Sequence, residues 1–241
     1  MQIIILAAGK GSRMKSVLPK VMHEVSGKAM LEHVVENCKE ITDDLVLVYS
    51  DHLKPHLDQF KDRCKIVKQN QQKGTAHAVL AAKDLFDEQE TIAVIYGDNP
   101  LITPDIISGL LKHTQDTNSK ATTLAFRYDK PNQYGRIIVD KNGDFESIVE
   151  TKFASEEQKK ITLCNSGIMA FAPGILSQYI EKCTKIRSDN PEREFYLTDI
   201  IEICKQAGEK VSYYELQERE RVVGVNTQEE LAKANELIHK I

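Results

Sequence analysis

The sequence predicts an α/β protein with a Rossmann-like, mostly parallel β-sheet, helices on both faces of that sheet, and added β-hairpins in its second half. Three observations predict this class. Short apolar runs alternate with amphipathic segments in the first half, which is typical of parallel strands joined by covering helices. A glycine-containing loop directly follows the first apolar run. Later in the chain the pattern changes to strand-like segments separated by turn residues.

The first half opens with a strand and continues with alternating helices and strands. Ile3–Ala7 is apolar throughout, as expected for a strand that is buried on both faces. Met30–Ile41 places Leu31, Val34 and Cys38 at helical spacing and so predicts a helix. The other expected elements of this half are strands Leu45–Tyr49, Ile66–Lys68 and Thr91–Tyr96, a helix Thr75–Phe86, and a helix that begins at Thr103-Pro104.

The second half predicts paired strands and further helices. Arg136–Asp140 and Phe145–Glu150 flank the turn residues Lys141-Asn142-Gly143-Asp144, a pattern that is typical of a hairpin. The other expected elements are strands Ala121–Tyr128 and Asn165–Ala172, a helix that starts at Pro173, and helices opened by two capping boxes, Ser155 with Gln158 and Thr227 with Glu230.

Composition and charge exclude several classes of protein. The 241 residues carry 32 lysine plus arginine against 36 aspartate plus glutamate, a formal net charge of −4, which argues against bulk binding to nucleic acid or acidic lipid. Five scattered cysteines without a Cys-x-x-Cys pair indicate buried thiols in a reducing compartment. The apolar N-terminal run has no basic leader and is too short for a signal peptide or a membrane span. We therefore expect a cytoplasmic protein with neither nucleic acid nor membrane as partner.

The most informative motif is the loop after the first strand, where residues 6–14 read L-A-A-G-K-G-S-R-M. Glycine lets the backbone approach a ligand closely, and backbone N–H groups in such a loop can hold phosphate oxygens. Lys10, Arg13 and Lys20 add positive charge that suits a triphosphate. The dinucleotide fingerprint G-x-G-x-x-G is excluded because Met14 takes the place of its third glycine, and no P-loop occurs. A tight turn with solvated lysines is the alternative interpretation of the loop alone.

A carboxylate follows the strand that ends in Tyr96-Gly97-Asp98. Ligands of open α/β sheets bind beyond the carboxyl ends of the strands, so we expect Asp98 at the same edge as the glycine loop. A carboxylate at this place can hold Mg²⁺ beside substrate phosphates. The alternative is an aspartate that only caps the turn at Asn99-Pro100.

A third feature is Gln69, which stands five residues before Gly74-Thr75 at the start of an alanine-rich segment. The backbone of a Gly-Thr pair can hydrogen-bond a planar ring, and a glutamine side chain offers both a donor and an acceptor. Spacing alone favours the simpler interpretation, a helix N-cap and a surface glutamine.

These motifs together resemble the uridylyltransferase domain of N-acetylglucosamine-1-phosphate uridylyltransferase, within the sugar-phosphate nucleotidyltransferase family. The resemblance covers nearly the whole chain and implies a fold of nucleotidyltransferase type. It implies a nucleotidyltransferase domain over 1–227 and a C-terminal helix over 228–241. The matching segments, in family order, are residues 6–14, 18–21, Gln69 with 74–78, 96–98 with 100–102, 134–137, 148–150, 165–168, 194–200 and 224–226.

The resemblance also implies a role for each matching position. Backbone and side-chain groups near the first loop and the alanine-rich segment would bind the nucleotide, and groups from the second half would bind the sugar. By this resemblance Arg13, Lys20 and Asp98 are catalytic; Leu6, Ala8, Gly9, Lys20, Gln69, Gly74, Thr75, Tyr96 and Gly97 bind the nucleotide; Gly135, Glu150, Asn165, Tyr196 and Thr198 bind the sugar; and Asp98 and Asn226 bind Mg²⁺.

The implied reaction is Mg²⁺-dependent transfer of UMP from UTP to N-acetylglucosamine-1-phosphate, with pyrophosphate as the second product. Three alternatives remain at this point. In the first, the acceptor is another sugar-1-phosphate, of glucose or N-acetylmuramic acid. In the second, the chain is a catalytically silent sugar-nucleotide sensor. In the third, it is a nucleotidyltransferase for molybdenum cofactor or a terpenoid phosphate. The retained charged residues argue against a sensor, and the segments around Glu150, Asn165 and 194–199 fit the last alternative less well.

The sequence departs from the family pattern at three places. Asn99 stands where the family has a small apolar residue, and Gln133 stands where it has glycine before Tyr134. Many family members continue into a left-handed β-helix that acetylates glucosamine-1-phosphate. This sequence contains no hexapeptide repeat, so no acetyltransferase domain is expected, and because that β-helix forms the trimer, we expect a monomer.

Overall fold

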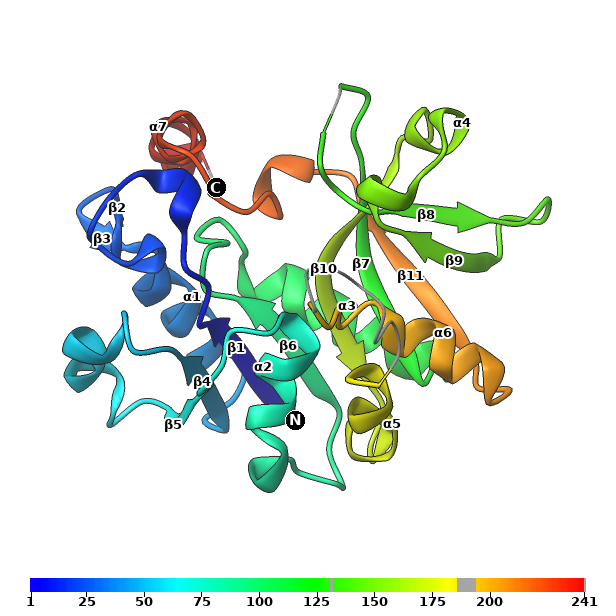
Figure 1. Ribbon diagram of the computed structural model, residues 1–241, viewed down its shortest axis with the longest axis horizontal. Coiled ribbons are helices and arrows are strands. Elements are labelled where there is room, and N and C mark those ends of the chain that lie inside the picture. The colour runs from blue at the N-terminus through cyan, green and yellow to red at the C-terminus, as the bar shows by residue number, and fades with distance from the viewer. Residues whose placement is uncertain (131, 186–193, 241) are drawn as a thin grey trace.

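The computed structural model describes residues 1–130, 132–185 and 194–240, and over this part of the chain it contains one large mixed sheet with helices packed on both sides (Figure 1). Its strands are β1 (Gln2–Ala7), β2 (Glu24–Val25), β3 (Lys28–Ala29), β4 (Leu45–Tyr49), β5 (Lys65–Lys68), β6 (Ile92–Tyr96), β7 (Ala121–Arg127), β8 (Arg136–Val139), β9 (Phe145–Val149), β10 (Leu163–Phe171) and β11 (Val211–Leu216). Its α-helices are α1 (Met30–Lys39), α2 (Thr75–Ala81), α3 (Pro104–Asp116), α4 (Glu156–Lys159), α5 (Ile175–Cys183), α6 (Asp199–Gln206) and α7 (Gln228–Leu237).

The large sheet runs in the order β11-β7-β10-β6-β1-β4-β5. β1 pairs in parallel with β4 and β6, β4 with β5, and β11 with β7, whereas β10 runs antiparallel to both of its neighbours, β6 and β7. The predicted mostly parallel sheet is therefore confirmed. Because β1, β4 and β6 are parallel, their carboxyl ends open onto the same edge of the sheet, where ligands of such folds bind.

Different helices cover the two faces of the sheet because side chains alternate along each strand. On β1, Ile3 and Ile5 pack into a buried cluster with α1 and α3. Ile4 and Leu6 point the other way and pack into a second cluster with α2, α5 and α6. All residues of β1 are buried, which explains why the strand is apolar without alternation from Ile3 to Ala7.

The second half adds an antiparallel hairpin and returns the chain to its beginning. β8 and β9 pair in the register Arg136 with Val149, and β8 meets β10 where Arg136 lies opposite Cys164. At the C-terminal end, α7 lies beside the small β2–β3 ribbon, and its Ala234 is buried in a cluster with Val25 (Figure 1). As a result, the segment before α7 lies next to the first loop of the chain.

Two predicted boundaries differ from the structure. α2 ends at Ala81, and a separate 3-10 turn covers Lys83–Leu85. The N–H of Ala82 donates to the carbonyl of Val79, three residues back, and so departs from the α-helical pattern. The helix expected at Pro173 begins at Ile175 after Gly174, which has a positive φ of 76°. Both helices expected from capping boxes form, with both hydrogen bonds of each box in place. No helix among the described residues is long and apolar enough to span a bilayer.

The central strand gives a test of the core. Ile5 is fully buried and lies between Leu47 of β4 and Ile95 of β6. We expect Ile5→Ala to lower the free energy of unfolding by about 2–5 kcal/mol, through lost apolar burial and the cavity that remains. Val17→Ala, at a fully exposed side chain, is the matched control and should change it by less than about 0.5 kcal/mol. Urea denaturation followed by circular dichroism measures both, and equal values for the two variants would contradict this packing.

Candidate active site

A cavity of about 540 Å³ lies at the carboxyl edge of β1 and β6. Its walls come from the loop after β1, the start of α2, the end of β6 and the segment before α7. These segments are far apart in the sequence, and the sheet brings their polar groups to one place. The predicted site residues that line it are Leu6, Ala8, Gly9, Arg13, Lys20, Gln69, Gly74, Thr75, Tyr96, Asp98 and Asn226.

The first loop reaches the cavity because Gly11 allows a close approach of the chain to Lys20. Gly11 has a positive φ of 62°, and a Cβ atom at this position would stand 2.5 Å from the Cβ of Lys20. The loop then closes with a 3-10 turn over Ser12–Met14, in which the N–H of Met14 donates to the carbonyl of Gly11. A residue larger than glycine would push Lys20 out of the cavity wall.

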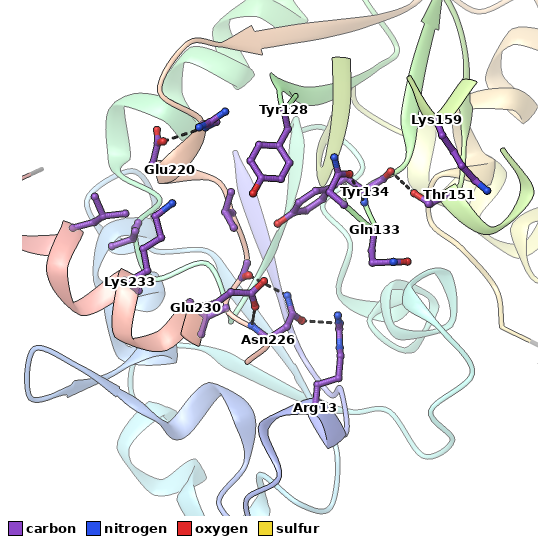
Figure 2. Close-up of a pocket in the computed structure, with 18 residues that line it drawn as sticks. Arg13, Tyr128, Gln133, Tyr134, Thr151, Lys159, Glu220, Asn226, Glu230 and Lys233 are labelled. Atoms are coloured by element: carbon purple, nitrogen blue, oxygen red, sulfur yellow. Dashed lines mark hydrogen bonds and ion pairs between the residues drawn. The ribbon is translucent and has the colours of Figure 1, made fainter. Parts of the chain in front are cut away.

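Four polar side chains from distant segments meet at one wall of the cavity. The Lys20 ammonium donates to a carboxylate oxygen of Asp98 and to the Oδ1 of Asn226, the latter at 3.0 Å. Arg13 donates to the same Oδ1 at 2.9 Å, as Figure 2 shows. The Lys20 and Asp98 side chains are only 13% and 16% exposed, so water screens their attraction far less than that of a surface ion pair. The wall is therefore an ordered group of two cations and two side-chain oxygen acceptors.

The segment that carries Asn226 is tied to the loop after β6. The N–H of Val225 donates to the Asp98 carbonyl at 2.9 Å. The Asn99 amide, which is buried, donates to the carbonyl of Val222 at 2.8 Å. This bond explains the polar residue at a position where the family has a small apolar one, since Asn99 holds the segment that delivers Asn226.

The Asp98 and Asn226 side chains have the chemistry of a magnesium site. Both direct an oxygen at the same ammonium group of Lys20, so the two oxygens converge on one cation. Mg²⁺ prefers oxygen ligands and is commonly held by one or two protein groups, with waters and substrate phosphates completing its shell. The described residues contain no group of three or more histidine, cysteine, aspartate or glutamate side chains that could hold a metal, so a dedicated all-protein cage is not formed among them. The residues at this wall fit Mg²⁺.

Another part of the cavity wall is built around Gln69. This side chain is buried rather than on the surface, and its amide donates to the Gly74 carbonyl and contacts the Nδ1 of His77, both at 3.1 Å. Gly74 has a φ of 100° and packs so closely on Phe195 that a Cβ would stand 2.4 Å from the Phe195 carbonyl oxygen. The Thr75 hydroxyl accepts from the N–H of Leu197 at 2.9 Å and does not cap α2. The amide and backbone groups of this wall are thus held rigidly.

The structure also places one glutamine in the cavity wall that the sequence motifs do not single out. Gln72 donates its amide to the carbonyl of Ala8 at 2.5 Å and lines the cavity. It therefore joins the Gln69–Gly74 loop to the first loop. The sequence contains one signal that could have identified Gln72, because it is a second amide side chain between Gln69 and Gly74, which are both predicted site residues.

Four of the predicted sugar-binding residues lie together on the side of the β8–β9 hairpin. Glu150 accepts from the Thr198 hydroxyl at 2.9 Å, and the N–H of Asn165 donates to the Gly135 carbonyl at 2.9 Å. A Cβ on Gly135 would stand 3.5 Å from a carboxylate oxygen of Glu150. None of the described residues that line the 540 Å³ cavity belongs to this group, so it forms a separate cluster of polar groups.

Tyr96 lines the cavity at the end of β6. Its pKa is raised above the usual value first by burial, and then by the negative charges of Asp98 and Glu150. Both carboxylates are therefore close enough to act on one phenol. Gly167, with a φ of 87°, makes room for this ring, since a Cβ there would stand 3.0 Å from two of the Tyr96 side-chain atoms.

Two predicted site residues do not join these clusters. The Tyr196 hydroxyl donates to Glu194 at 2.7 Å and accepts from Lys152 at 2.5 Å, on the exposed side of the segment. Gly97 does not line the cavity, and a Cβ there would meet the Leu31 side chain at 3.0 Å. In this structure Gly97 is a packing position beneath the cavity floor.

Residues 3–161 match the family model described as a MobA-like NTP transferase domain. The chain belongs to this family. It is 37% identical over 241 residues to a protein called Bifunctional protein GlmU from Alkaliphilus metalliredigens, which covers 100% of this chain and 52% of that relative. It is 39% identical over 242 residues to a protein of the same name from Enterococcus faecalis, with 98% and 52% covered. The chain spans about half the length of the curated relatives it matches. The family predicted from the motifs, and with it a nucleotidyltransferase, is confirmed.

Solved structures show the same fold for this nucleotidyltransferase. A putative glucose-1-phosphate thymidylyltransferase from Bacillus anthracis, in complex with a sucrose, matches with a TM-score of 0.76 and 21% identity over 100% of this chain and 96% of its own. A UDP-glucose pyrophosphorylase complexed with UDP-glucose matches with a TM-score of 0.75 and 18% identity over 99% and 98%. At these identities the likeness concerns the fold, and it confirms the predicted nucleotidyltransferase type.

Gly74 gives a test of the rigid wall. Its φ of 100° and ψ of 179° fall in a region that is essentially restricted to glycine, and a Cβ would collide with the Phe195 backbone. We expect Gly74→Ala to lower the free energy of unfolding by about 1–3 kcal/mol or more and to weaken nucleotide binding. Gly143→Ala is the matched control, because Gly143 also has a positive φ but lies in the β8–β9 turn with open space around it. Isothermal titration should show that only the first variant loses nucleotide affinity.

His77 gives a test of pH dependence. Burial, and then the nearby Lys73 charge, lowers the pKa of His77 below its ordinary value of 6.5. Folding thus favours the neutral ring, which is the form whose Nδ1 can accept from Gln69. The contribution of His77 to stability is complete above pH 6.5 and is lost as the pH falls through its lower folded pKa. An NMR titration of the His77 ring protons should give a midpoint below 6.5; a midpoint at or above 6.5 would contradict this environment.

Proposed function

We propose that this chain transfers UMP from UTP to N-acetylglucosamine-1-phosphate and releases pyrophosphate, in an Mg²⁺-dependent reaction. The observation that carries the proposal is the meeting of Arg13, Lys20, Asp98 and Asn226 at one wall of a cavity that the buried Gln69 also lines. This wall suits phosphates, and the part around Gln69 suits a planar base. Relatives at 37–39% identity that are called bifunctional protein GlmU support the assignment.

The reaction needs no nucleophilic side chain. The acceptor phosphate is already ionised at neutral pH, so its oxygen forms the new bond to the α-phosphorus of UTP while the bond from that phosphorus to the bridging oxygen breaks and pyrophosphate leaves. What the protein must do is align two polyanions and neutralise the growing charge. Arg13 and Lys20 stand at the glycine loop with donors directed into the cavity wall, where such preorganised charge is most effective.

Asp98 and Asn226 are the residues that would hold Mg²⁺. When bound, the ion supplies Lewis-acid stabilisation of charge on the phosphate oxygens. The chain itself orients both ligands, because Arg13 and Lys20 donate to the Asn226 oxygen and the backbone of Val225 donates to the Asp98 carbonyl. The oxygen pair is therefore set in place before a ligand arrives.

The polar cluster beside the β8–β9 hairpin is the proposed sugar subsite. The Glu150 carboxylate can accept from sugar hydroxyls, and the buried Asn165 stands beside Gly135. Tyr96 lies within the field of both Glu150 and Asp98, which links this cluster to the phosphate wall. We assign the acetamido group of the sugar to the vicinity of Thr198 and Tyr196, which requires the exposed Tyr196 hydroxyl to exchange its present partners for the ligand.

We also infer that the protein works in the cytoplasm with nucleotide and sugar-phosphate as its partners. All five cysteines are buried and free, which suits a reducing compartment. Burial raises the pKa of Cys64 to about 11, so this thiol stays protonated and unreactive at neutral pH.

The experiment that tests the function measures pyrophosphate release from UTP with Mg²⁺ and a panel of sugar-1-phosphates, with EDTA as control. We expect metal-dependent turnover that is fastest with N-acetylglucosamine-1-phosphate. Faster turnover with glucose-1-phosphate or N-acetylmuramic acid-1-phosphate would keep the mechanism and change the acceptor. Tight binding of UDP-sugars without turnover on any acceptor would instead identify a sensor.

Two variants should separate the phosphate wall from the sugar subsite. We expect Asp98→Ala to lower kcat by about 10²–10³, the usual effect of losing one preorganised contact to developing charge, with the fold retained. Glu150→Ala should mainly raise KM for the sugar-1-phosphate, because its contacts are made to sugar hydroxyls. Asp116→Ala, at an exposed residue on α3, is the control and should leave both constants unchanged. Near-normal turnover of Asp98→Ala would remove this residue from the mechanism.

A further inference from the structure

Glu230 makes one more contact than a helix cap requires. It is the third residue of α7, and one carboxylate oxygen accepts from the Thr227 N–H at 3.0 Å, which completes the capping box. The same oxygen also accepts from the N–H of Asn226 at 2.6 Å. In the capping box of α4, the Gln158 side chain accepts from the N–H of Ser155, and no second bond to this side chain is found among the described residues. Glu230 thus reaches past the helix and onto the predicted metal ligand.

Asn226 has open space on two sides. It lines the 540 Å³ cavity on one side, and on the other it lines a second cavity of about 720 Å³ beneath α7, together with Tyr134 and Lys233. Figure 2 shows this second cavity, with Glu230 on one side of Asn226 and Arg13 on the other. Asn226 and Arg13 line both cavities, so open space adjoins the Asn226 side chain and hydrogen bonds contribute to its position.

The bonds to Asn226 come from opposite directions. Arg13 and Lys20 hold its side-chain oxygen at the phosphate wall, whereas Glu230 holds its backbone N–H. A bond from an N–H to a carboxylate is stronger than one between neutral groups. The charge of Glu230 also contributes, with burial first and with Asp98, to the raised pKa of Tyr134, so Glu230 and Asp98 act on the same phenol.

We propose that Glu230 is a positioning residue, which fixes the backbone of Asn226 so that its side-chain oxygen meets Asp98 at the proposed Mg²⁺ site. The inference rests on the proposed function, because it takes Asn226 as a metal ligand. Groups that orient metal ligands typically change metal affinity about 10–100-fold when they are removed. The effect of Glu230 is therefore expected in the coupling between metal and nucleotide, and not in nucleotide binding alone.

Isothermal titration of the whole chain with UTP, in Mg²⁺ and in EDTA, measures this coupling without turnover. The wild type should bind UTP more tightly in Mg²⁺, and Glu230→Ala should lose about tenfold of that gain while its affinity in EDTA stays unchanged. Glu230→Gln should retain the gain within about twofold, because its amide oxygen can accept from the same two N–H groups. A gain that is unchanged in Glu230→Ala would overturn the proposal.

Thr227→Ala is the matched control for helix capping. It removes the hydroxyl that accepts from the Glu230 N–H but leaves the bond from Asn226 to Glu230 in place. We expect a lower Tm with an unchanged Mg²⁺ gain. An equal loss of gain in Thr227→Ala and Glu230→Ala would mean that Glu230 acts only as a cap, which contradicts positioning. If Glu230→Ala does not fold, Glu230→Asp carries the same expectation, since it keeps the charge but is one methylene too short to reach Asn226.

Asn226→Ala separates failure of this inference from failure of the proposed site. Loss of the Mg²⁺ gain in Asn226→Ala together with retention in Glu230→Ala would overturn the positioning role alone. Full retention of the gain in Asn226→Ala, or a wild type without any gain, would overturn the metal site and the positioning role together. Parallel losses in both variants, with Thr227→Ala unaffected, are the expected result.

Discussion

The Lys20 ammonium, held between Asp98 and Asn226, is the interaction on which the arrangement of the site depends. It joins the loop after β1, the loop after β6 and the segment before α7. These three segments are far apart in the sequence. Placing an unpaired charge in a wall that is largely shielded from water would be costly, so each partner requires the others. Arg13 adds a second cation to the same oxygen. Asp98 offsets one of the two positive charges, so the wall still presents positive charge to an incoming anion.

The sheet decides where this wall stands. Because β1 and β6 are parallel neighbours, the glycine loop and Asp98 emerge side by side. The antiparallel β10 next to β6 then brings Asn165 from the opposite direction, and the β8–β9 hairpin attached to it brings Glu150. A change of strand direction beside β6 therefore separates the proposed phosphate wall from the proposed sugar subsite, and after burial the charges of Asp98 and Glu150 raise the pKa of Tyr96 at the end of β6.

Local patterns predicted those features whose cause is local. The apolar run of β1, the hairpin turn, the capping boxes of α4 and α7 and the glycine loop were all predicted at positions where the structure has them. Predictions that depend on neighbours in space were less accurate. The surface position favoured for Gln69 by spacing alone is wrong, because the loop up to Gly74 folds over it. The predicted helix Thr75–Phe86 is too long, since α2 ends at Ala81, where the N–H of Ala82 donates to the carbonyl of Val79.

By itself, the sequence determined the α/β class, the family and the identities of the charged groups, because strand and helix periodicity and the short motifs are properties of neighbouring residues. Only the tertiary structure decided which groups meet. Lys20 and Asn226 are separated by 206 positions, and nothing in the local pattern places them within a hydrogen bond. The contact of Asn99 with Val222, 123 positions away, is likewise a product of tertiary packing, whereas the bond from Asn226 to Glu230 spans only four positions and is local. Side chains far apart in the sequence become partners only when the chain folds. The sequence therefore predicts which residues belong to the site, but not how their atoms are arranged.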